Sequence, residues 1–340
     1  MNSVQPKVAI VILNYNTRSL LERFLPSVLA TEYGNKEVWV VDNASTDDSA
    51  NYIKEHFAED IKLLVSPENY GYAGGYNWAL EQIEADYYVL LNSDVSVPVD
   101  WLSPLVDMAV ADKNIGAIQP KILDAKQPEL FEYAGASGGY LDKWGYPFCR
   151  GRIFDTLEED KGQYNEAQAV FWATGACLFV RAELYHKAGA LDADFFAHME
   201  EIDLCWRLQR MGNTVMVQPR SEVYHLGGGT LAEGSERKYF LNFRNNLVLL
   251  AKNLDSPFWL LTILWRMLLD GISAIKFVLD GQPKRVVTIV KAHFAFWGSL
   301  GTTLRKRKSV KKIGNTKVHL YSKSIVWHYF AKGKKVFTDL

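Results

Sequence analysis

Four polar motifs in the first hundred residues carry side chains that can hold a nucleotide or a cation. In chain order they are Asn14-Tyr15-Asn16, Asp42-Asn43, the glycine-containing stretch from Asn69 to Asn77, and Asn92-Ser93-Asp94. The Asp94 carboxylate is a hard oxygen ligand, of the kind that Mg²⁺ or Mn²⁺ shares with substrate phosphates. Asp42 and Asn43 can pair with a nucleobase or a ribose hydroxyl. Each motif also has a structural interpretation, since Asp and Asn cap helices and close turns.

The third motif places three glycines in front of a predicted helix. Gly71, Gly74 and Gly75 permit close approach of the backbone, and the first turn of a helix favours phosphate. The motif is neither GxGxxG nor a lysine-containing phosphate loop. A plain turn with a helix cap is therefore the alternative interpretation.

Two further motifs lie in the second half of the chain. Glu200, Glu201 and Asp203 place three carboxylates within four residues, before an apolar helical segment. Burial and mutual repulsion raise carboxylate pKa values, which suits a general base; an acidic helix N-terminus is the structural alternative. Arg207, one turn later, is expected to pair with Asp203. His225 follows an apolar strand and precedes three glycines, and it is either a structural residue or a metal ligand.

Alternating strands and helices must position these motifs. Continuous apolar runs predict buried parallel strands, and apolar residues three and four apart predict helices. The strands are expected at 8–13, 37–41, 61–65, 87–91, 170–181 and 215–219, and the helices at 19–30, 49–57, 73–83, 201–211 and beyond 239. Ligands bind at the carboxyl ends of strands in such sheets, where all four N-terminal motifs lie. Residues 124–168 are predicted to form a long excursion over the acceptor side.

Composition limits the class of protein. The chain has 340 residues, of which 48% are hydrophobic and 23% charged, which is typical of a globular protein with a sizeable core. Cys149, Cys177 and Cys205 form no CxxC motif, which argues against a zinc site or a disulfide framework and fits a reducing compartment. No signal peptide is predicted. We therefore expect a cytoplasmic location.

The C-terminal region is basic. Residues 301–340 contain 11 Lys or Arg and one acid. The preceding stretch, 257–304, is apolar but interrupted by charges such as Arg266 and Asp270, which are four apart and are expected to pair. Apolar helices beside a basic cluster predict peripheral association of 257–335 with an anionic membrane surface, on the inner face of the cell membrane. A helical subdomain or a homodimer interface is the alternative, and nucleic acid is not an expected partner.

Taken in order, the motifs resemble those of the family 2 glycosyltransferases, in particular the rhamnosyltransferase-like branch, over residues 8–253. They are Val11 to Asn16, Val41 to Asp47, Asn69 to Asn77, Leu91 to Val95, Thr174-Gly175-Ala176 and Glu200 to Arg207. The resemblance implies a GT-A fold, which is an α/β structure with a mostly parallel twisted sheet flanked by helices. Here a catalytic domain at 1–240 is expected to carry a helical C-terminal region at 241–340.

The resemblance also assigns roles to the motifs. Glu201 stands where the family's catalytic base is expected, with Glu200 and Asp203 on the acceptor side. Asn92-Ser93-Asp94 resembles the family's DxD metal motif with Asn in place of the first acid. The residues expected to bind the nucleotide-sugar donor are Asn14, Tyr15, Asn16, Asp42, Asn43, Asn69, Gly71, Gly75, Asn77, Asn92, Ser93, Thr174 and Gly175.

Because Asn92 stands in place of the first acid, the metal motif is one acid short. Asp94 is then the main carboxylate for a divalent cation, Mg²⁺ or Mn²⁺, and His225 is the candidate second ligand. The cation would neutralise the departing nucleoside diphosphate while the base takes a proton from the acceptor hydroxyl.

The implied reaction inverts the anomeric carbon and moves one sugar to a hydroxyl of a glycan or a lipid-linked glycan, in cell-surface polysaccharide synthesis. dTDP-rhamnose and UDP-sugars are the candidate donors. A non-catalytic sugar- or nucleotide-binding module is one alternative. A processive polysaccharide synthase is another, disfavoured because Cys205-Trp206-Arg207 is not the QxxRW motif. A nucleotidyltransferase is disfavoured because the first strand ends in Asn14-Tyr15-Asn16 and lacks a Gly-rich loop with Arg and Lys.

Overall fold

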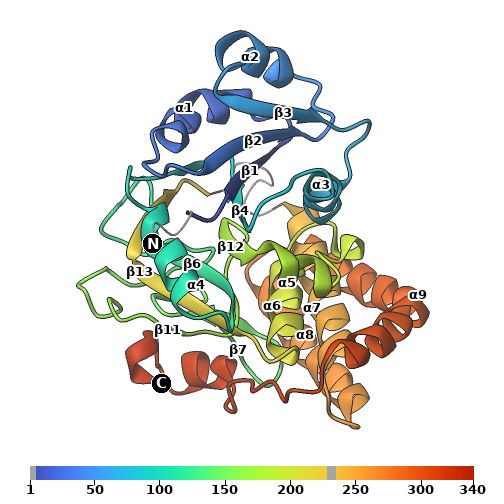
Figure 1. The fold of residues 1–340 in the computed structure, drawn as a ribbon. Coiled ribbons are helices and arrows are strands. Elements are labelled where there is room, and N and C mark those ends of the chain that lie inside the picture. Colours follow the sequence, from blue (N-terminus) through green and yellow to red (C-terminus); the bar gives the residue numbers. More distant parts are fainter. Residues whose placement is uncertain (1–4, 228–234) are drawn as a thin grey trace.

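The computed structural model describes residues 5–227 and 235–340, and Figure 1 shows its fold. In chain order its strands and helices are β1 (Val8–Asn14), α1 (Arg18–Leu29), β2 (Lys36–Asp42), α2 (Ser49–His56), β3 (Ile61–Val65), α3 (Gly71–Leu80), β4 (Tyr87–Asn92), β5 (Val95–Ser96), α4 (Leu102–Ala111), β6 (Ile115–Asp124), β7 (Gly139–Leu141), β8 (Pro147–Cys149), β9 (Arg152–Ile153), β10 (Thr156–Leu157), β11 (Gln168–Ala169), β12 (Cys177–Arg181), α5 (Ala182–Lys187), η1 (Ala193–Phe195), α6 (Glu200–Arg210), β13 (Thr214–His225), α7 (Glu236–Asn253), α8 (Trp259–Leu279), α9 (Lys284–Ile313), η2 (Trp327–Ala331) and η3 (Phe337–Asp339).

The main sheet is built around β1, a continuous apolar strand that is buried on both faces. Within the described residues the sheet has nine strands in the order β11-β13-β6-β12-β4-β1-β2-β3, with β5 paired to β13. Strand β1 is parallel to both β2 and β4. The chain therefore moves outward from β1 to β3 and returns on the other side of β1 at β4. Such a switch point is where ligands bind in doubly wound sheets.

The sheet is mixed, since β12 runs antiparallel to both of its neighbours, β4 and β6. The prediction of an α/β fold with helices on both faces is confirmed, but several details differ. Strand β12 begins at Cys177 and not at residue 170, and β13 continues past 219 to His225 through an irregularity between Gln218 and Glu222. The sequence analysis did not predict α4 or β6.

The excursion at 124–168 contains a second sheet, with strand order β10-β9-β8-β7. The C-terminal segment packs against it, because Phe148 and Ile153 share an apolar cluster with Ile325 and Tyr329. The Asp142 carboxylate accepts a hydrogen bond of 2.9 Å from the Ile325 amide. Figure 1 shows this segment running from α9 back beneath β7. The end of the chain is thus joined to the segment expected on the acceptor side.

The two faces of the main sheet are covered by different helices. Helices α1 and α4 pack on one face, and α3, α6 and α7 on the other. The predicted boundary between residues 240 and 241 falls inside α7, whose buried leucines belong to the same core as α6. Figure 1 shows α5 to α9 gathered on one side of the molecule, away from α1 and α2. The C-terminal helices are therefore continuous with the core that supports the motifs.

Candidate active site

A row of polar side chains joins the carboxyl ends of β2, β1 and β4. The Asn14 amide nitrogen lies 3.5 Å from Asp42 Oδ2 and donates to Ser45 Oγ at 3.1 Å. Thr17 Oγ1 donates to Asn14 Oδ1 at 2.5 Å and lies 3.2 Å from Ser93 Oγ. The structure therefore brings together three of the motifs that the sequence placed at strand ends.

Tyr15 and Asn16 form the outer edge of this row. The Tyr15 side chain is exposed. Asn16 has a positive φ of 55°, and its side-chain oxygen accepts from the Thr46 amide at 2.7 Å. Asn16 thus shapes the loop after β2, while the Tyr15 ring is available to a ligand.

Asn43 and the start of α3 are engaged inside the protein. The Asn43 amide nitrogen donates to Asn69 Oδ1 at 3.1 Å and to Gly71 O at 3.0 Å. The Gly71 amide donates to Asn69 Oδ1, and the amides of Tyr72 and Ala73 donate to a carbonyl of the 192–199 loop. The first-turn amides that the sequence suggested for phosphate are therefore already satisfied, and the structure lends this expected phosphate site no support.

The glycines of this motif are explained by close packing. Gly71 has a φ of +71°, and a Cβ atom there would lie 2.6 Å from the Phe196 ring. A Cβ atom at Gly75 would lie 2.8 Å from Leu13, because α3 crosses β1 at this point. Glycine is thus required for the helix to reach the sheet, which accounts for the motif without a ligand.

Asn77, Thr174 and Gly175 also have partners within the protein. The Asn77 amide donates to Leu191 O at 2.7 Å, and its oxygen accepts from the Tyr185 hydroxyl. The Thr174 amide donates to a buried glutamine at 3.1 Å. The Tyr72 hydroxyl donates to Gly175 O at 2.6 Å, which ties the start of α3 to the turn before β12. Donor contacts of these three residues stay predictions.

Asp94 and His225 lie together, as required for a shared metal site. The antiparallel pairing of β5 with β13 sets His225 opposite the residue after Asp94, and His225 Nε2 lies 3.1 Å from Asp94 Oδ1. Asn92 Nδ2 lies 3.4 Å from the same ring nitrogen. The other nitrogen, Nδ1, lies 3.1 Å from Glu132 Oε1. Burial opposes the charged imidazole, but Asp94 and Glu132 outweigh it and raise the pKa of His225 to about 10.

These residues fit a divalent cation that is shared with a substrate and that displaces the proton of His225, since only the neutral imidazole binds a metal. Mg²⁺ commonly takes one or two protein ligands and completes its shell with phosphate oxygens and water. A metal-bound histidine typically has its second ring nitrogen held by a carboxylate, which is the position of Glu132. Among the residues that the structure describes, no group of three His, Cys, Asp or Glu side chains is arranged to hold a metal ion alone.

Glu132 is a residue that the sequence analysis missed. It is buried, and it lies in the 124–168 excursion, where no periodicity or motif marks it. Only the pairing of β13 with β6 and the return of the chain after β6 bring it to the imidazole. No signal in the sequence pointed to this contact.

Glu200 and Glu201 begin α6 and face surroundings with few polar partners. Burial raises the pKa of Glu201 from 4.5 to about 7. Burial, and next the neighbouring Glu201 carboxylate, hold the pKa of Glu200 well above its usual range. The Oε2 atoms of both residues are buried without a hydrogen-bond partner. Buried carboxyl oxygens without partners are costly and gather at functional sites, so the two residues fit proton transfer.

Asp203 occupies a different environment from its two neighbours in sequence. It is fully buried, and its carboxylate lies 2.8 Å from Arg207 and 2.9 Å from Lys252. The predicted pairing with Arg207 is confirmed. Because Asn253 occupies the second oxygen at 2.8 Å, both oxygens are held inside the protein. This environment assigns Asp203 to the anchoring of α6, and we leave it out of the acceptor side.

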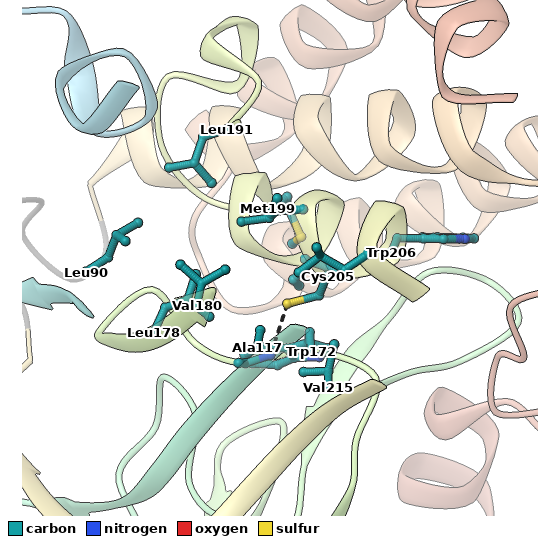
Figure 2. Close-up of a cluster of buried hydrophobic side chains, with 14 of the residues drawn as sticks. Leu90, Ala117, Trp172, Leu178, Val180, Leu191, Met199, Cys205, Trp206 and Val215 are labelled. Carbon is teal, nitrogen blue, oxygen red and sulfur yellow. Dashed lines mark hydrogen bonds between the residues drawn. The ribbon is translucent and has the colours of Figure 1, made fainter. Parts of the chain in front are cut away.

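Helix α6 is fixed to the sheet by its apolar face. Figure 2 shows the Cys205 side chain pointing toward Ala117 and Trp172, and Cys205 Sγ accepts a hydrogen bond of 3.4 Å from the Ala173 amide. The whole of this cluster is buried. Helix α6 therefore has a fixed position against the sheet.

The loop that leads into α6 is held by the C-terminal helices. The Asn245 amide of α7 donates to the carbonyls of Phe195, Ala197 and His198, at 3.0, 2.8 and 2.7 Å. Lys252 pairs with Asp192 at 2.6 Å. The φ angles of 66° to 76° at Phe196, His198 and Met199 are unusual for residues other than glycine. The C-terminal helices thus hold the backbone that presents Glu200 and Glu201.

The fold is that of the GT-A glycosyltransferases. The mannosyltransferase PcManGT from Pyrobaculum calidifontis, solved in complex with GDP-Man and Mn²⁺, matches with a TM-score of 0.53 and 16% identity over 97% of this chain and 89% of that one. The crystal structure of GalNAc-T7 with UDP, GalNAc and Mn²⁺ matches with a TM-score of 0.58 and 17% identity over 74% of this chain and 48% of that one. At these identities the likeness is one of fold.

The family follows from the sequence match. Residues 9–184 match the model described as Glycosyl transferase family 2. Because this span is more than half of the chain, the chain belongs to that family and is a glycosyltransferase, as its motifs predicted. The matched span ends before Glu201 and His225, so the roles of these two residues rest on geometry.

The names of two relatives describe the reactions of proteins that are similar to this chain in sequence. The N-acetylglucosaminyl-diphospho-decaprenol L-rhamnosyltransferase of Mycobacterium tuberculosis is 26% identical over 282 residues, which are 78% of this chain and 90% of that protein. The low-salt glycan biosynthesis hexosyltransferase Agl10 of Haloferax volcanii is 23% identical over 257 residues, which are 73% of this chain and 78% of that protein. The first name describes transfer of rhamnose, and the second describes transfer of a hexose in the biosynthesis of a glycan.

Proposed function

We propose that this glycosyltransferase moves one sugar from a nucleotide-sugar donor to an acceptor hydroxyl, with inversion, and that Glu201 is its base. The observation that carries the proposal is the position of Glu201 at the head of a rigidly held helix, where its carboxyl is buried, lacks a hydrogen-bond partner on Oε2 and has a pKa of about 7. A base poised near neutral pH is the one best suited to take a proton from a hydroxyl. The buried Asp94 and His225 pair would stand on the leaving-group side.

The proposed step is a single displacement. Glu201 takes the proton of the acceptor hydroxyl as its oxygen forms a bond to the anomeric carbon, and the bond from that carbon to the diphosphate oxygen breaks on the opposite face. A divalent cation held by Asp94 and His225, either Mg²⁺ or Mn²⁺, would supply positive charge to the departing diphosphate. Glu132 would orient His225 through the far ring nitrogen. Glu200, whose pKa burial and the neighbouring Glu201 hold well above its usual range, would donate a hydrogen bond on the acceptor side in its protonated form.

The donor nucleoside is proposed to lie along the polar row at the ends of β1 and β2. The Asp42 carboxylate and the Asn14 amide can bind ribose or base, and the exposed Tyr15 ring can stack on the base. Asn43, Asn69, Gly71 and Gly75 are proposed to shape this surface, since their polar groups or close packing serve contacts within the protein.

The donor and acceptor are proposed by analogy with the relatives. The name of the mycobacterial relative includes both rhamnose and a lipid diphosphate carrier, which supports dTDP-rhamnose or a UDP-sugar as donor and a glycan or lipid-linked glycan as acceptor. A lipid-linked acceptor would place the reaction at a membrane surface. Three buried free cysteines are consistent with the cytoplasmic side.

Release of nucleoside diphosphate tests the proposal. The full chain is incubated with a panel of dTDP-, UDP- and GDP-sugars, with Mn²⁺, with Mg²⁺ or with a chelator. We expect metal-dependent release from one class of donor, and loss of metal stimulation in Asp94→Ala. Asp100→Ala is the matched control, because Asp100 is an exposed acid close to Asp94 in the chain. Metal-stimulated release that survives in Asp94→Ala refutes the metal assignment. Binding of a nucleotide sugar without release or transfer favours the non-catalytic module.

A further inference from the structure

Helix α8 turns the charged side chains of Arg266 and Asp270 inward and most of its apolar side chains outward, while Lys276 near its end is exposed. Arg266 and Asp270 are buried, and their charged groups are 3.0 Å apart. Asp270 also lies 3.1 Å from His293 Nε2, so the pair faces the neighbouring helix α9. The opposite side of α8 is exposed and apolar, and its members are Leu261, Leu264, Trp265, Leu268, Ile272, Ile275 and Leu279. Because these positions recur every three or four residues, they form one continuous stripe.

Helix α9 presents a stripe of the same kind. In its first half the exposed apolar residues are Val287, Val290, Phe294 and Trp297, with the exposed Lys284 and Lys291 beside them. Further along the same side of the helix the exposed residues are basic, namely Arg305, Lys308 and Lys312. Spacings of three and four residues keep all of these positions on one side. We call the two stripes together the α8–α9 face.

The two helices lie antiparallel, which sets the basic end of the α8–α9 face beside the start of α8. His293 meets Asp270 in the middle of α8, and the Arg307 guanidinium lies 5.3 Å above the ring of Trp259 in its first turn. Both helices also pack against α7. The exposed stripes are therefore the sides that no other described element of the chain covers.

This distribution is the reverse of an ordinary surface helix, which turns its polar side to water. Leu279 and Phe294 are 81% and 73% exposed. Contiguous exposed apolar surface of this extent marks an interaction site. Residues 257–340 contain 16 Lys or Arg and three Asp or Glu. Of the three acids, Asp270 is buried in its pair and Asp280 lies 2.5 Å from Lys276.

We infer that the α8–α9 face lies on an anionic lipid bilayer. The apolar stripes would enter the boundary between headgroups and acyl chains, and Arg305, Lys308 and Lys312 would meet lipid phosphates. Trp265 and Trp297 lie within the stripes, and tryptophan is enriched at this depth of a bilayer. None of the helices in residues 5–227 and 235–340 is long and apolar enough to cross a membrane.

The face is joined directly to the acceptor side of the site. Lys306, on α9, pairs with Asp192 and Asp194 in the loop before Glu200. A chain seated on a bilayer through α8 and α9 would therefore hold this loop at a fixed height above the lipid surface. The inference extends the proposed function by giving a lipid-linked acceptor its place, but the contact with lipid does not depend on which sugar is transferred.

A second copy of the chain is the competing occupant. A two-fold dimer would use the same patch on both molecules. The basic half of each α9 would then face either the basic half of its partner, which is repulsive, or the apolar half, where the charges lose water without gaining a partner. An anionic bilayer neutralises the basic half and receives the apolar half. The charge pattern therefore favours lipid.

Co-flotation with vesicles tests the inference on the full chain. The vesicles are phosphatidylcholine alone or phosphatidylcholine mixed with phosphatidylglycerol. One double variant, Leu268→Asp with Ile272→Asp, places acids on the apolar stripe. Another, Arg305→Glu with Lys308→Glu, reverses the basic end. Val110→Asp is the matched control, because Val110 on α4 is 53% exposed and lies outside the α8–α9 face.

We expect the parent chain and the Val110→Asp control to float with the anionic vesicles, and less so as salt is raised. The apolar-stripe variant should lose at least about tenfold in partitioning. The basic-end variant should lose roughly fivefold per charge, on anionic vesicles only. Equal flotation of the parent and the apolar-stripe variant overturns the inference. The inference is also overturned if the parent chain sediments as a dimer and the Leu268→Asp with Ile272→Asp variant sediments as a monomer.

Release of diphosphate without vesicles is measured on every variant, because it reports on the fold and on the proposed function separately. It should be unchanged, since the substituted side chains are exposed and make none of the contacts described above that hold the 192–199 loop. Flotation by a chain that releases no diphosphate from any donor would sink the proposed function and leave the lipid inference standing.

Discussion

Replacement of Glu201 by Gln should make the protein more stable at alkaline pH while it removes transfer. The pKa of Glu201 is raised by burial from 4.5 to about 7, so folding favours the protonated carboxyl. The stabilisation that this provides is complete below pH 4.5 and is lost as the pH rises through about 7. At pH 8 the folded protein therefore carries an unfavourable charge, which a neutral glutamine does not have.

The size of the expected stability change follows from the pKa shift of Glu201. One pKa unit corresponds to about 1.4 kcal/mol, so a shift from 4.5 to about 7 sets an upper limit of about 3 kcal/mol. Glu201 is partly exposed, and solvent screening reduces this figure. We expect Glu201→Gln to raise the free energy of unfolding by about 2 kcal/mol at pH 8 and by close to zero at pH 4.5. The glutamine fills the same volume, so the difference isolates the charge.

Urea denaturation of both proteins at several pH values measures the effect, with Glu183→Gln as the control. Glu183 is an exposed acid on α5 and should change stability little at any pH. In parallel, kcat/KM for transfer by the parent should fall about tenfold per unit below pH 7, as expected for loss of a base. A stability difference that does not vary with pH would refute the reasoning about burial. Transfer by Glu201→Gln near the parent rate would refute the role of base.

Three other substitutions test the residues that hold the candidate site in place. Asn245→Ala removes three hydrogen bonds to the loop before α6. The free energy of unfolding, measured in urea, should fall by up to about 3 kcal/mol, and the rate of transfer should fall with it. If neither the stability nor the rate changes, the loop keeps its conformation without Asn245. Lys252→Met removes the cation that Asp192 and Asp203 share, so the free energy of unfolding should fall by about 3 kcal/mol. The control Lys54→Met, at an exposed position, should leave stability unchanged. Equal stability of the two variants would contradict the pairing. Glu132→Gln should weaken Mn²⁺ binding by roughly 10- to 100-fold in calorimetry with nucleotide present, and parent-like affinity would remove Glu132 from the metal site.

The sequence predicted the elements from β1 to β4 because these strands and helices follow one another locally. The buried strand at β1 and the helix at α1 can be recognised from apolar spacing alone. The pairing of Arg266 with Asp270 was predicted for the same reason, since both lie on one helix. Long-range features were not accessible in this way. Glu132 and Asn245 acquire their roles from contacts with residues far away in the chain, and no local spacing encodes such contacts.

The N-terminal motifs show a second reason for incomplete prediction. Asn43, Asn69 and Gly71 have the chemistry of a nucleotide-binding loop and equally the chemistry of a capped turn. The same amide groups serve both purposes, so residue types alone do not separate them. Asp203 illustrates the converse case, because its neighbours Glu200 and Glu201 made it look like part of a reactive cluster. Its burial beside Lys252 depends on α7, and Lys252 lies 49 residues further along the chain.

The attachment of the 192–199 loop to α7 and α9 also sets the order in which the enzyme is completed during synthesis. The strands that carry Asp42 and Asp94 leave the ribosome early and can pair at once. Glu201 follows, but Asn245, Lys252 and Lys306 are still to come. At roughly 5–20 residues per second, Lys306 emerges about 5–20 s after Glu201. A nascent chain therefore holds an assembled sheet well before it holds a positioned base, so activity is the last property that this fold acquires.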